Sequence, residues 1–227
     1  MKSSSSRHTH SLVAAGLVAI AAYGLTGCNQ EQAPPPRYPA PPPPIAGAPL
    51  VYYKFPFQGK WKVLRTHYGA KQADQTYAVD LVPEGNVGDK QQNSTYPCHN
   101  QYVIADAPGI VVIAVDGIPE NVPGTPNVYD QHGNYVVIDH QNGEFSLMAH
   151  LIPGTLKVRA GTPVQAGMEL GRCGNTGLST LPHIHWQVMD NANAAVARGI
   201  PPRFAPYERN GSLSTDLPDK KDTMLNK

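Results

Sequence analysis

The sequence predicts an all-β domain, built as an antiparallel β-sandwich or barrel-like fold, and three observations support this fold class. The chain of 227 residues contains 23 Pro and 21 Gly, which helices disfavour. Apolar and polar residues alternate with a period of two through its middle. Turn signals recur roughly every 8–12 residues. A hydrophobic content of 41% is enough to build a core and excludes a fully disordered chain.

The N-terminal residues 1–27 are typical of a bacterial lipoprotein signal peptide. Lys2 and Arg7 give a short positive region, and an uncharged apolar run over 12–25 follows them. This run is too short for a comfortable transmembrane helix. It leads into Leu-Thr-Gly and then Cys28, which resembles the lipobox in which the Cys is acylated and the preceding residues are removed. An ordinary signal peptide that happens to end near a Cys is the alternative.

The next segment, residues 28–50, is expected to be an acylated Cys followed by a tether. Nine Pro lie between Gln30 and Leu50, a density that favours extended polyproline II and spans on the order of 60 Å. A Pro-rich ligand for a partner domain is the alternative. Asn29, not Asp, follows the Cys, and by the same resemblance this favours export to the outer membrane, facing the periplasm.

The charge of the chain is close to neutral. It carries 18 Lys and Arg against 17 Asp and Glu, a net charge of +1. Removal of residues 1–27, which contain two basic and no acidic residues, leaves 1 − 2 = −1. A phosphate-binding surface would show a basic excess, so no nucleic-acid partner is expected.

Residues 51–207 are expected to form the folded domain, and the polar residues 208–227 a weakly ordered tail. The Asn-Gly pair within 140–144 predicts a hairpin turn between two strands. Apolar and β-branched runs predict strands at 103–105, 109–115, 135–139, 145–149 and 182–188, with short β segments at 161–164, 167–171 and 174–177.

Two Cys remain after lipidation of Cys28. An exported domain lies in an oxidising compartment, so a disulfide between Cys98 and Cys173 is expected. Closing so long a loop would stabilise the fold by roughly 3–5 kcal/mol. The competing idea, a thiolate zinc site, needs more Cys or a C-x-x-C pair, and the sequence has neither.

The sequence Pro-His-Ile-His-Trp at 182–186 suggests a functional site. On a strand, residues two apart point to the same face, so His183 and His185 would project side by side, opposite Ile184 and Trp186. Two neighbouring imidazoles suit a metal site or a ligand beside a proton-transfer group. Taken alone, such a pair is equally compatible with a structural or surface role.

The residues around this pair resemble the lysostaphin-type (LytM-like) zinc metallopeptidases of bacterial cell walls. That family's signature runs V-x-I-x-H-x-N-G, A-H-L, V-x-x-G-x-x-V-x-x-G-x-x-(I/L)-G, G-x-(S/T)-G and H-(L/I)-H-(F/W). The chain matches it in order with GNYVVIDHQNGEFSLMAHL from Gly133 and VRAGTPVQAGMELGRCGNTGLSTLPHIHWQVMD from Val158. The resemblance covers roughly 60–190, and 103–190 is the specific part. It implies the duplicated hybrid β motif of these peptidases, with a substrate groove.

The resemblance implies one zinc ion held by His67, Asp80 and His185. The compact family motif H-x-x-x-D is absent, and the best match joins Thr-His67-Tyr-Gly to Tyr-Ala-Val-Asp80 across 13 positions. Asp80 would share a strand face with Ala78, which allows it to point into a groove. Asp74 is the rival ligand. A surface His67 and a strand-end Asp80 without a metal are the alternatives.

The resemblance also implies two catalytic His that are not ligands, His150 in A-H-L and His183. Three protein ligands leave a fourth position for water, and zinc lowers the pKa of that water to about 7. One of the two His would take the proton and the other steady the oxyanion, with either assignment open. A satisfied core His is the alternative for His150.

The remaining polar candidates receive less weight. His140 is expected to be exposed in the hairpin turn, and His99 and His132 lie in polar loops. Asn175 and Ser179 precede the His pair and are candidates for the border of the groove.

The expected function is therefore a zinc metalloendopeptidase that hydrolyses stem or cross-link peptides of peptidoglycan through a zinc-bound water. The alternative is a catalytically inactive LytM-like lipoprotein that activates or scaffolds other wall hydrolases, with wall-hydrolase or divisome proteins as partners. A lipoprotein that binds a wall fragment without cutting it is a third hypothesis. A complete set of metal ligands favours the enzyme over the inactive regulator and the binding lipoprotein. The sequence leaves open which peptide bond is cut.

Overall fold

The computed structural model describes residues 47–227. The predicted signal peptide 1–27, the acylated Cys28 and most of the tether 28–50 lie outside the described residues and stay predictions. Over 47–227, no helix is both long enough and apolar enough to cross a membrane.

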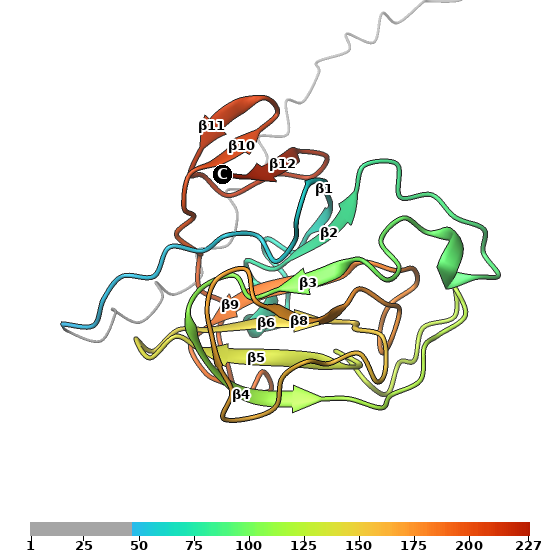
Figure 1. Cartoon of the computed structure of the whole chain (residues 1–227), viewed down its shortest axis with the longest axis horizontal. Coiled ribbons are helices and arrows are strands. Elements are labelled where there is room, and N and C mark those ends of the chain that lie inside the picture. The colour runs from blue at the N-terminus through green and yellow to red at the C-terminus, as the bar shows by residue number, and fades with distance from the viewer. Residues whose placement is uncertain (1–46) are drawn as a thin grey trace, which may run out of the picture. The chain divides into compact units, whose positions relative to one another are not determined.

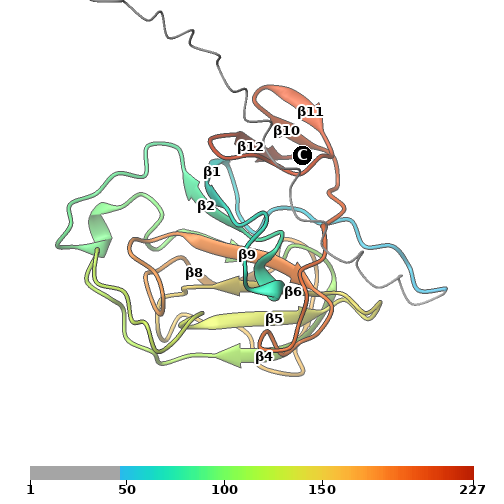
Figure 2. The ribbon, with the colours of Figure 1, turned by 180° about the vertical axis from the view of Figure 1, so that it is seen from behind.

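The described part of the chain is built on antiparallel strands, which confirms the predicted fold class (Figure 1, Figure 2). A ten-stranded sheet has the order β11-β10-β12-β1-β2-β9-β6-β5-β4-β7, and β3 pairs with β8 in a second, two-stranded sheet. The helical elements of residues 47–227 are two single 3₁₀ turns, η1 (Ala73–Gln75) and η2 (Asn93–Thr95). The strands are β1 (Lys60–Thr66), β2 (Val79–Pro83), β3 (Tyr102–Ile104), β4 (Gly109–Val115), β5 (Tyr135–Asp139), β6 (Phe145–Ala149), β7 (Pro163–Val164), β8 (Glu169–Arg172), β9 (Ile184–Met189), β10 (Tyr207–Arg209), β11 (Ser212–Ser214) and β12 (Thr223–Asn226).

Most strands lie where their alternating pattern predicts them. The predicted strands 109–115, 135–139 and 145–149 coincide with β4, β5 and β6. The predicted β segment 174–177 is wrong, because this stretch makes only an isolated bridge, between Thr176 and Glu120. The pattern there reflects Gly-rich turns, which share their spacing with short strands.

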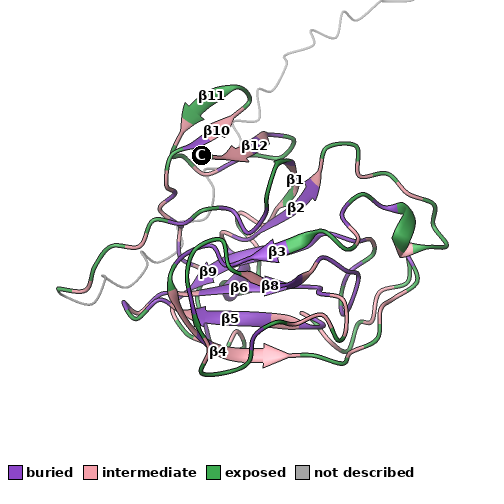
Figure 3. Ribbon diagram, viewed as in Figure 1, coloured by how far each residue is buried: buried purple, intermediate pink, exposed green. Residues whose placement is uncertain are grey.

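The two sheets share one hydrophobic core. Val103 of β3 and Leu170 of β8 belong to the same buried cluster as Met148 of β6 and Trp186 of β9. The central strands β2, β6 and β9 are the most buried (Figure 3). An aromatic cluster extends this core toward β10, with Phe55 stacked on Phe204 at a centroid distance of 4.6 Å. Such packing holds β9 in place, and with it the side chains on both faces of this strand.

The predicted weakly ordered tail at 208–227 is wrong, because this segment folds onto the main sheet. Strand β12 pairs with β1, with Met224 opposite Trp61, and β10 pairs with β12. Tyr207 and Met224 are fully buried. The side chains of Arg209 and Asn210 donate hydrogen bonds to Asp222. Few apolar residues suffice here because the strands complete an existing sheet, which a search for local periodicity does not detect.

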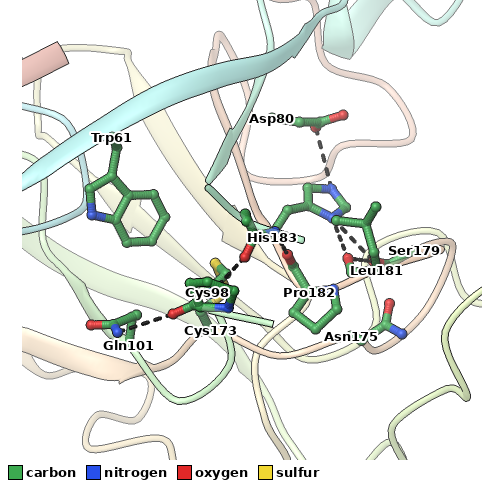
Figure 4. Close-up of a disulfide and its surroundings, with 12 residues drawn as sticks. Trp61, Asp80, Cys98, Gln101, Cys173, Asn175, Ser179, Leu181, Pro182 and His183 are labelled. Carbon is green, nitrogen blue, oxygen red and sulfur yellow. Dashed lines mark hydrogen bonds and ion pairs between the residues drawn. A yellow bond between two sulfur atoms is a disulfide. The ribbon is translucent and has the colours of Figure 1, made fainter. Parts of the chain in front are cut away.

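The predicted disulfide between Cys98 and Cys173 is confirmed, with both side chains fully buried (Figure 4). It links the loop after η2 to the residue that follows β8. The backbone reinforces the link, because Asn100 N–H donates to the Cys173 carbonyl at 2.8 Å. The disulfide thus fixes the segment that leads into β9.

The expectation of an exposed His140 is wrong. Its ring is buried, with Nδ1 donating to the Pro108 carbonyl at 2.8 Å and Nε2 2.9 Å from Ser146 Oγ. Ser146 Oγ donates to Asp106, whose other carboxylate oxygen accepts from Trp186 Nε1. The turn at 140–144 folds inward because this network supplies hydrogen-bond partners for the buried His140 ring.

Candidate active site

Three neighbouring strands bring the predicted metal ligands together. In the pairing of β2 with β9, Asp80 lies directly opposite His185. Strand β1 pairs with the other edge of β2 and ends at Thr66, so the next residue, His67, follows beside Asp80. The backbone N–H of His67 donates to the Ala78 carbonyl at 2.9 Å, which closes this arrangement.

The ligand atoms of His67, Asp80 and His185 all lie within 4.8 Å of one another. His67 Nε2 is 3.0 Å from Asp80 Oδ2, and His185 Nδ1 is 2.9 Å from Asp80 Oδ1. Asp80 and His185 are buried, and His67 is partly buried. His67 and Asp80 can therefore meet although they are 13 positions apart in sequence. Residues 68–78 form a loop that contains η1 and return the chain to β2.

The rival ligand Asp74 does not join this cluster. It lies on η1, where its carboxylate accepts a hydrogen bond from Gln187 Nε2 at 3.4 Å. Gln187 Oε1 in turn lies 2.9 Å from His185 Nε2. An amide oxygen can only accept, so the proton of His185 is on Nε2 and its lone pair is on Nδ1. Asp74 and Gln187 thus orient the His185 ring instead of binding beside it.

The cluster has the chemistry of a cation site. The Nδ1 lone pair of His185 faces a carboxylate oxygen of Asp80, and two acceptors this close need a cation between them. Burial alone lowers the pKa of His185, but the hydrogen bond and charge of Asp80 raise it above its ordinary value. Two imidazoles and one carboxylate are a donor set suited to zinc, with a position left for water.

The carboxyl group of Asp80 stays ionised in this setting. Burial alone would raise its pKa, but the charge and hydrogen bond of His183 oppose that effect, with hydrogen bonds from His185 and His67. The net result is a pKa well below the usual value for Asp80. An ionised carboxylate is the form that a metal requires.

The two remaining predicted His, His150 and His183, face the same place from two elements. Their ring centroids are 4.7 Å apart, and His183 Nε2 lies 3.5 Å from Asp80 Oδ1 (Figure 4). Backbone carbonyls accept from both Nδ1 atoms, Thr176 O at 2.8 Å from His150 and Leu181 O at 2.9 Å from His183. Each imidazole therefore directs Nε2 away from the backbone, and the Nε2 of His183 faces Asp80.

His150 sits in a strained backbone conformation. Its φ is +68°, a left-handed value that a residue other than Gly rarely adopts. Burial, followed by the nearby His183 and His185, lowers the pKa of His150 well below its ordinary value. This lowered pKa favours the neutral imidazole form of His150.

All five predicted site residues line a groove of about 870 Å³. Of the minor candidates, Ser179 supports the site, with Oγ 3.2 Å from His183 Nδ1. Asn175 does not line the groove, and its amide instead donates to Asn93 Oδ1 at 3.0 Å.

His132, which the sequence places in a polar loop and which received less weight, lies beside the predicted site. His132 lines the groove, and its ring centroid is 6.4 Å from that of His185. Its Nε2 is buried without a hydrogen-bond partner among residues 47–227. Burial and the neighbouring His185 lower the pKa of His132 to about 4. In the sequence, only the following Gly133 could have pointed to His132 as a groove residue. In the structure, Gly133 packs tightly against Thr176.

Comparison with known proteins gives one family. Residues 94–197 match the model of Peptidase family M23, a range that includes His150, His183 and His185 but begins after Asp80. Over 89 residues the chain is 34% identical to peptidoglycan DD-endopeptidase ShyA of Vibrio cholerae. That alignment covers 39% of this chain and 18% of ShyA, so the chain matches less than a fifth of this relative.

Two solved structures of M23-type peptidases are similar. The deep-sea M23 metalloprotease pseudoalterin is 17% identical, with 73% of this chain and 84% of that chain covered and a TM-score of 0.45. The catalytic domain of lysostaphin from Staphylococcus simulans is 22% identical, with 66% and 86% covered and a TM-score of 0.37. Both TM-scores are low, so the site described above rests on this chain's own geometry.

Proposed function

We propose that the chain is a member of peptidase family M23, whose model matches residues 94–197, and that it is a zinc-dependent endopeptidase that hydrolyses stem or cross-link peptides of peptidoglycan. The observation that carries this proposal is the convergence of His67, Asp80 and His185 with two further His in one groove. The identity to a peptidoglycan endopeptidase supports the substrate class.

The three clustered side chains would hold the metal. His67 offers Nε2, His185 offers Nδ1 and Asp80 offers an ionised carboxylate. A zinc ion held there supplies Lewis acidity, which makes water more acidic and polarises a carbonyl. Asp80 compensates part of the charge that such an ion brings into a largely buried site.

His150 and His183 would carry the proton and steady the developing charge. Both present Nε2 to the groove, because their Nδ1 protons are bound by backbone carbonyls. One neutral imidazole can take a proton from the attacking water and pass it to the leaving amine. The other, once protonated, can donate to the oxyanion. The depressed pKa of His150 suits it to the neutral form.

The proposed location of the enzyme rests on the N-terminal sequence alone. A lipid on Cys28 would anchor it in the outer membrane, and the Pro-rich tether through residue 50 would carry the domain toward the wall on the periplasmic side. Wall-hydrolase or divisome proteins would be its partners there.

Incubation of the full-length protein with purified sacculi, followed by mass analysis of the released muropeptides, tests this function. We expect the protein to release products of peptide-bond hydrolysis, and His150→Ala and His183→Ala to lower the rate by about 100-fold or more. His99→Ala is the matched control, because His99 pairs with Glu120 and does not line the groove. A folded, zinc-loaded protein that releases nothing would instead indicate the regulator or scaffold function.

A further inference from the structure

Two cationic side chains stand at the groove without a partner. Arg65 at the end of β1 and Lys220 before β12 both line the groove and are exposed. Neither side chain makes a hydrogen bond or an ion pair with any residue in 47–227. Two other cations in this part of the chain are engaged: Arg203 pairs with Glu144, and Arg209 with Asp222. The guanidinium and ammonium groups at the groove are therefore available to a ligand.

The fold holds Lys220 at the groove. The neighbouring Lys221 N–H donates to the Val63 carbonyl at 3.0 Å, which joins the loop before β12 to β1. The hydroxyl of Tyr68, itself a lining residue, donates to the Pro218 carbonyl at 2.6 Å. The loop before β12 thus contributes Lys220 to the groove, and β1, which pairs with β12, contributes Arg65.

The charged side chains that line the groove favour an anionic ligand. Asp80 is the sole carboxylate among the described lining residues, and the site's own His residues engage it. An anionic group at Arg65 and Lys220 would therefore meet two cations and no free acid. The chain is close to neutral as a whole, so these two charges suit a small number of carboxylates and not a polyanion.

We propose that Arg65 and Lys220 bind free carboxylates of an acidic peptide substrate, so that the loop before β12 forms part of the specificity site. This inference rests on the proposed peptidase function and deepens it, because it states which form of a peptide substrate, the free carboxylate or the uncharged carboxamide, the groove prefers. The guanidinium offers a bidentate contact and the ammonium a point charge. The protein then discriminates between the acidic and amidated forms of one peptide.

Calorimetric titration of the full-length protein with a stem tetrapeptide tests the inference, with the carboxamide form of the same peptide for comparison. We expect the carboxylate form to bind more tightly. Arg65→Gln and Lys220→Gln should each weaken its binding by about two- to fivefold and leave the carboxamide form unchanged. Added salt should reduce the difference between the peptides. Lys221→Gln is the matched control, because this adjacent lysine does not line the groove.

Equal affinity for the two peptides, binding of neither, or an equal effect of Lys221→Gln would overturn the inference. Binding is measured separately from cleavage, so failure of the two proposals is distinguishable. A protein that discriminates between the peptides but releases no muropeptides from sacculi contradicts the peptidase function alone. A protein that cleaves sacculi but binds both peptides equally contradicts the carboxylate site alone.

Discussion

Gln187 is a single residue whose role follows from its position beneath the candidate metal site. Its side-chain oxygen accepts from His185 Nε2, and this bond leaves Nδ1 free to face Asp80. The residue lies two positions after His185 on the same strand face, as the period of a strand requires. The H-x-H alternation therefore extends to an H-x-H-x-Q pattern in which the third member orients the second.

Gln187→Leu should weaken zinc binding by about 10- to 100-fold, because partners that orient a metal ligand typically contribute that much affinity. The measurement is a competition titration with a zinc chelator of known affinity. Gln101→Leu is the matched control, since Gln101 is exposed and donates only to the Pro97 carbonyl. Unchanged zinc affinity in a folded Gln187→Leu protein would contradict the role assigned to this side chain.

His132 presents a different problem at the same scale, a buried nitrogen without a partner in the described residues. His132→Phe keeps a ring but removes both nitrogens, so a substrate hydrogen bond would be lost. We expect KM for a cleaved peptide to rise about two- to tenfold with zinc content unchanged. His132→Asn should restore part of the affinity. If His132→Phe leaves KM unaltered, the nitrogen does not contact substrate.

At the scale of elements, β12 decides whether the C-terminal segment belongs to the domain. Met224→Ala removes a fully buried side chain opposite Trp61 and should lower the free energy of unfolding by about 2–5 kcal/mol. Leu213→Ala on β11, where 70% of the side chain is exposed, should change it by less than about 0.5 kcal/mol. Urea denaturation of the full chain gives both values. Two equally small changes would show that β12 does not pack against β1.

The disulfide links two elements that are distant in sequence, with a separation of 75 positions between Cys98 and Cys173. The double substitution Cys98→Ser and Cys173→Ser should lower the free energy of unfolding by about 3–5 kcal/mol, since the unfolded chain regains the freedom of a long loop. Because neither sulfur lines the groove, zinc content should not change. Loss of zinc in the folded double variant would contradict the separation of disulfide and site.

Sequence patterns predict elements well where the information is local. The strands β4, β5 and β6 follow from alternation, and the side-by-side placement of His183 and His185 follows from the period of a strand. The burial of His140 could not be predicted, because Ser146 and Pro108 satisfy its ring only after folding. The same holds for His132, which reaches the groove on an irregular loop.

At the scale of the whole molecule, the site depends on strand order. Strand β9 is far from β1 and β2 in sequence, and the antiparallel pairing of these three strands aligns His67, Asp80 and His185. Resemblance to a family could name these residues, but the register that places Asp80 opposite His185 is a property of the folded sheet. The C-terminal strands were unpredictable for the same reason, since their stability comes from the sheet they extend.

The metal content of the purified full-length protein tests the central claim most directly. Elemental mass spectrometry should find about one zinc per chain, retained in His99→Ala and lost in folded His185→Ala, because three ligands are needed to hold the ion. A folded wild-type protein without zinc in zinc-containing buffer at neutral pH, or a His185→Ala protein that keeps its zinc, would contradict the assignment of His67, Asp80 and His185 as the metal site.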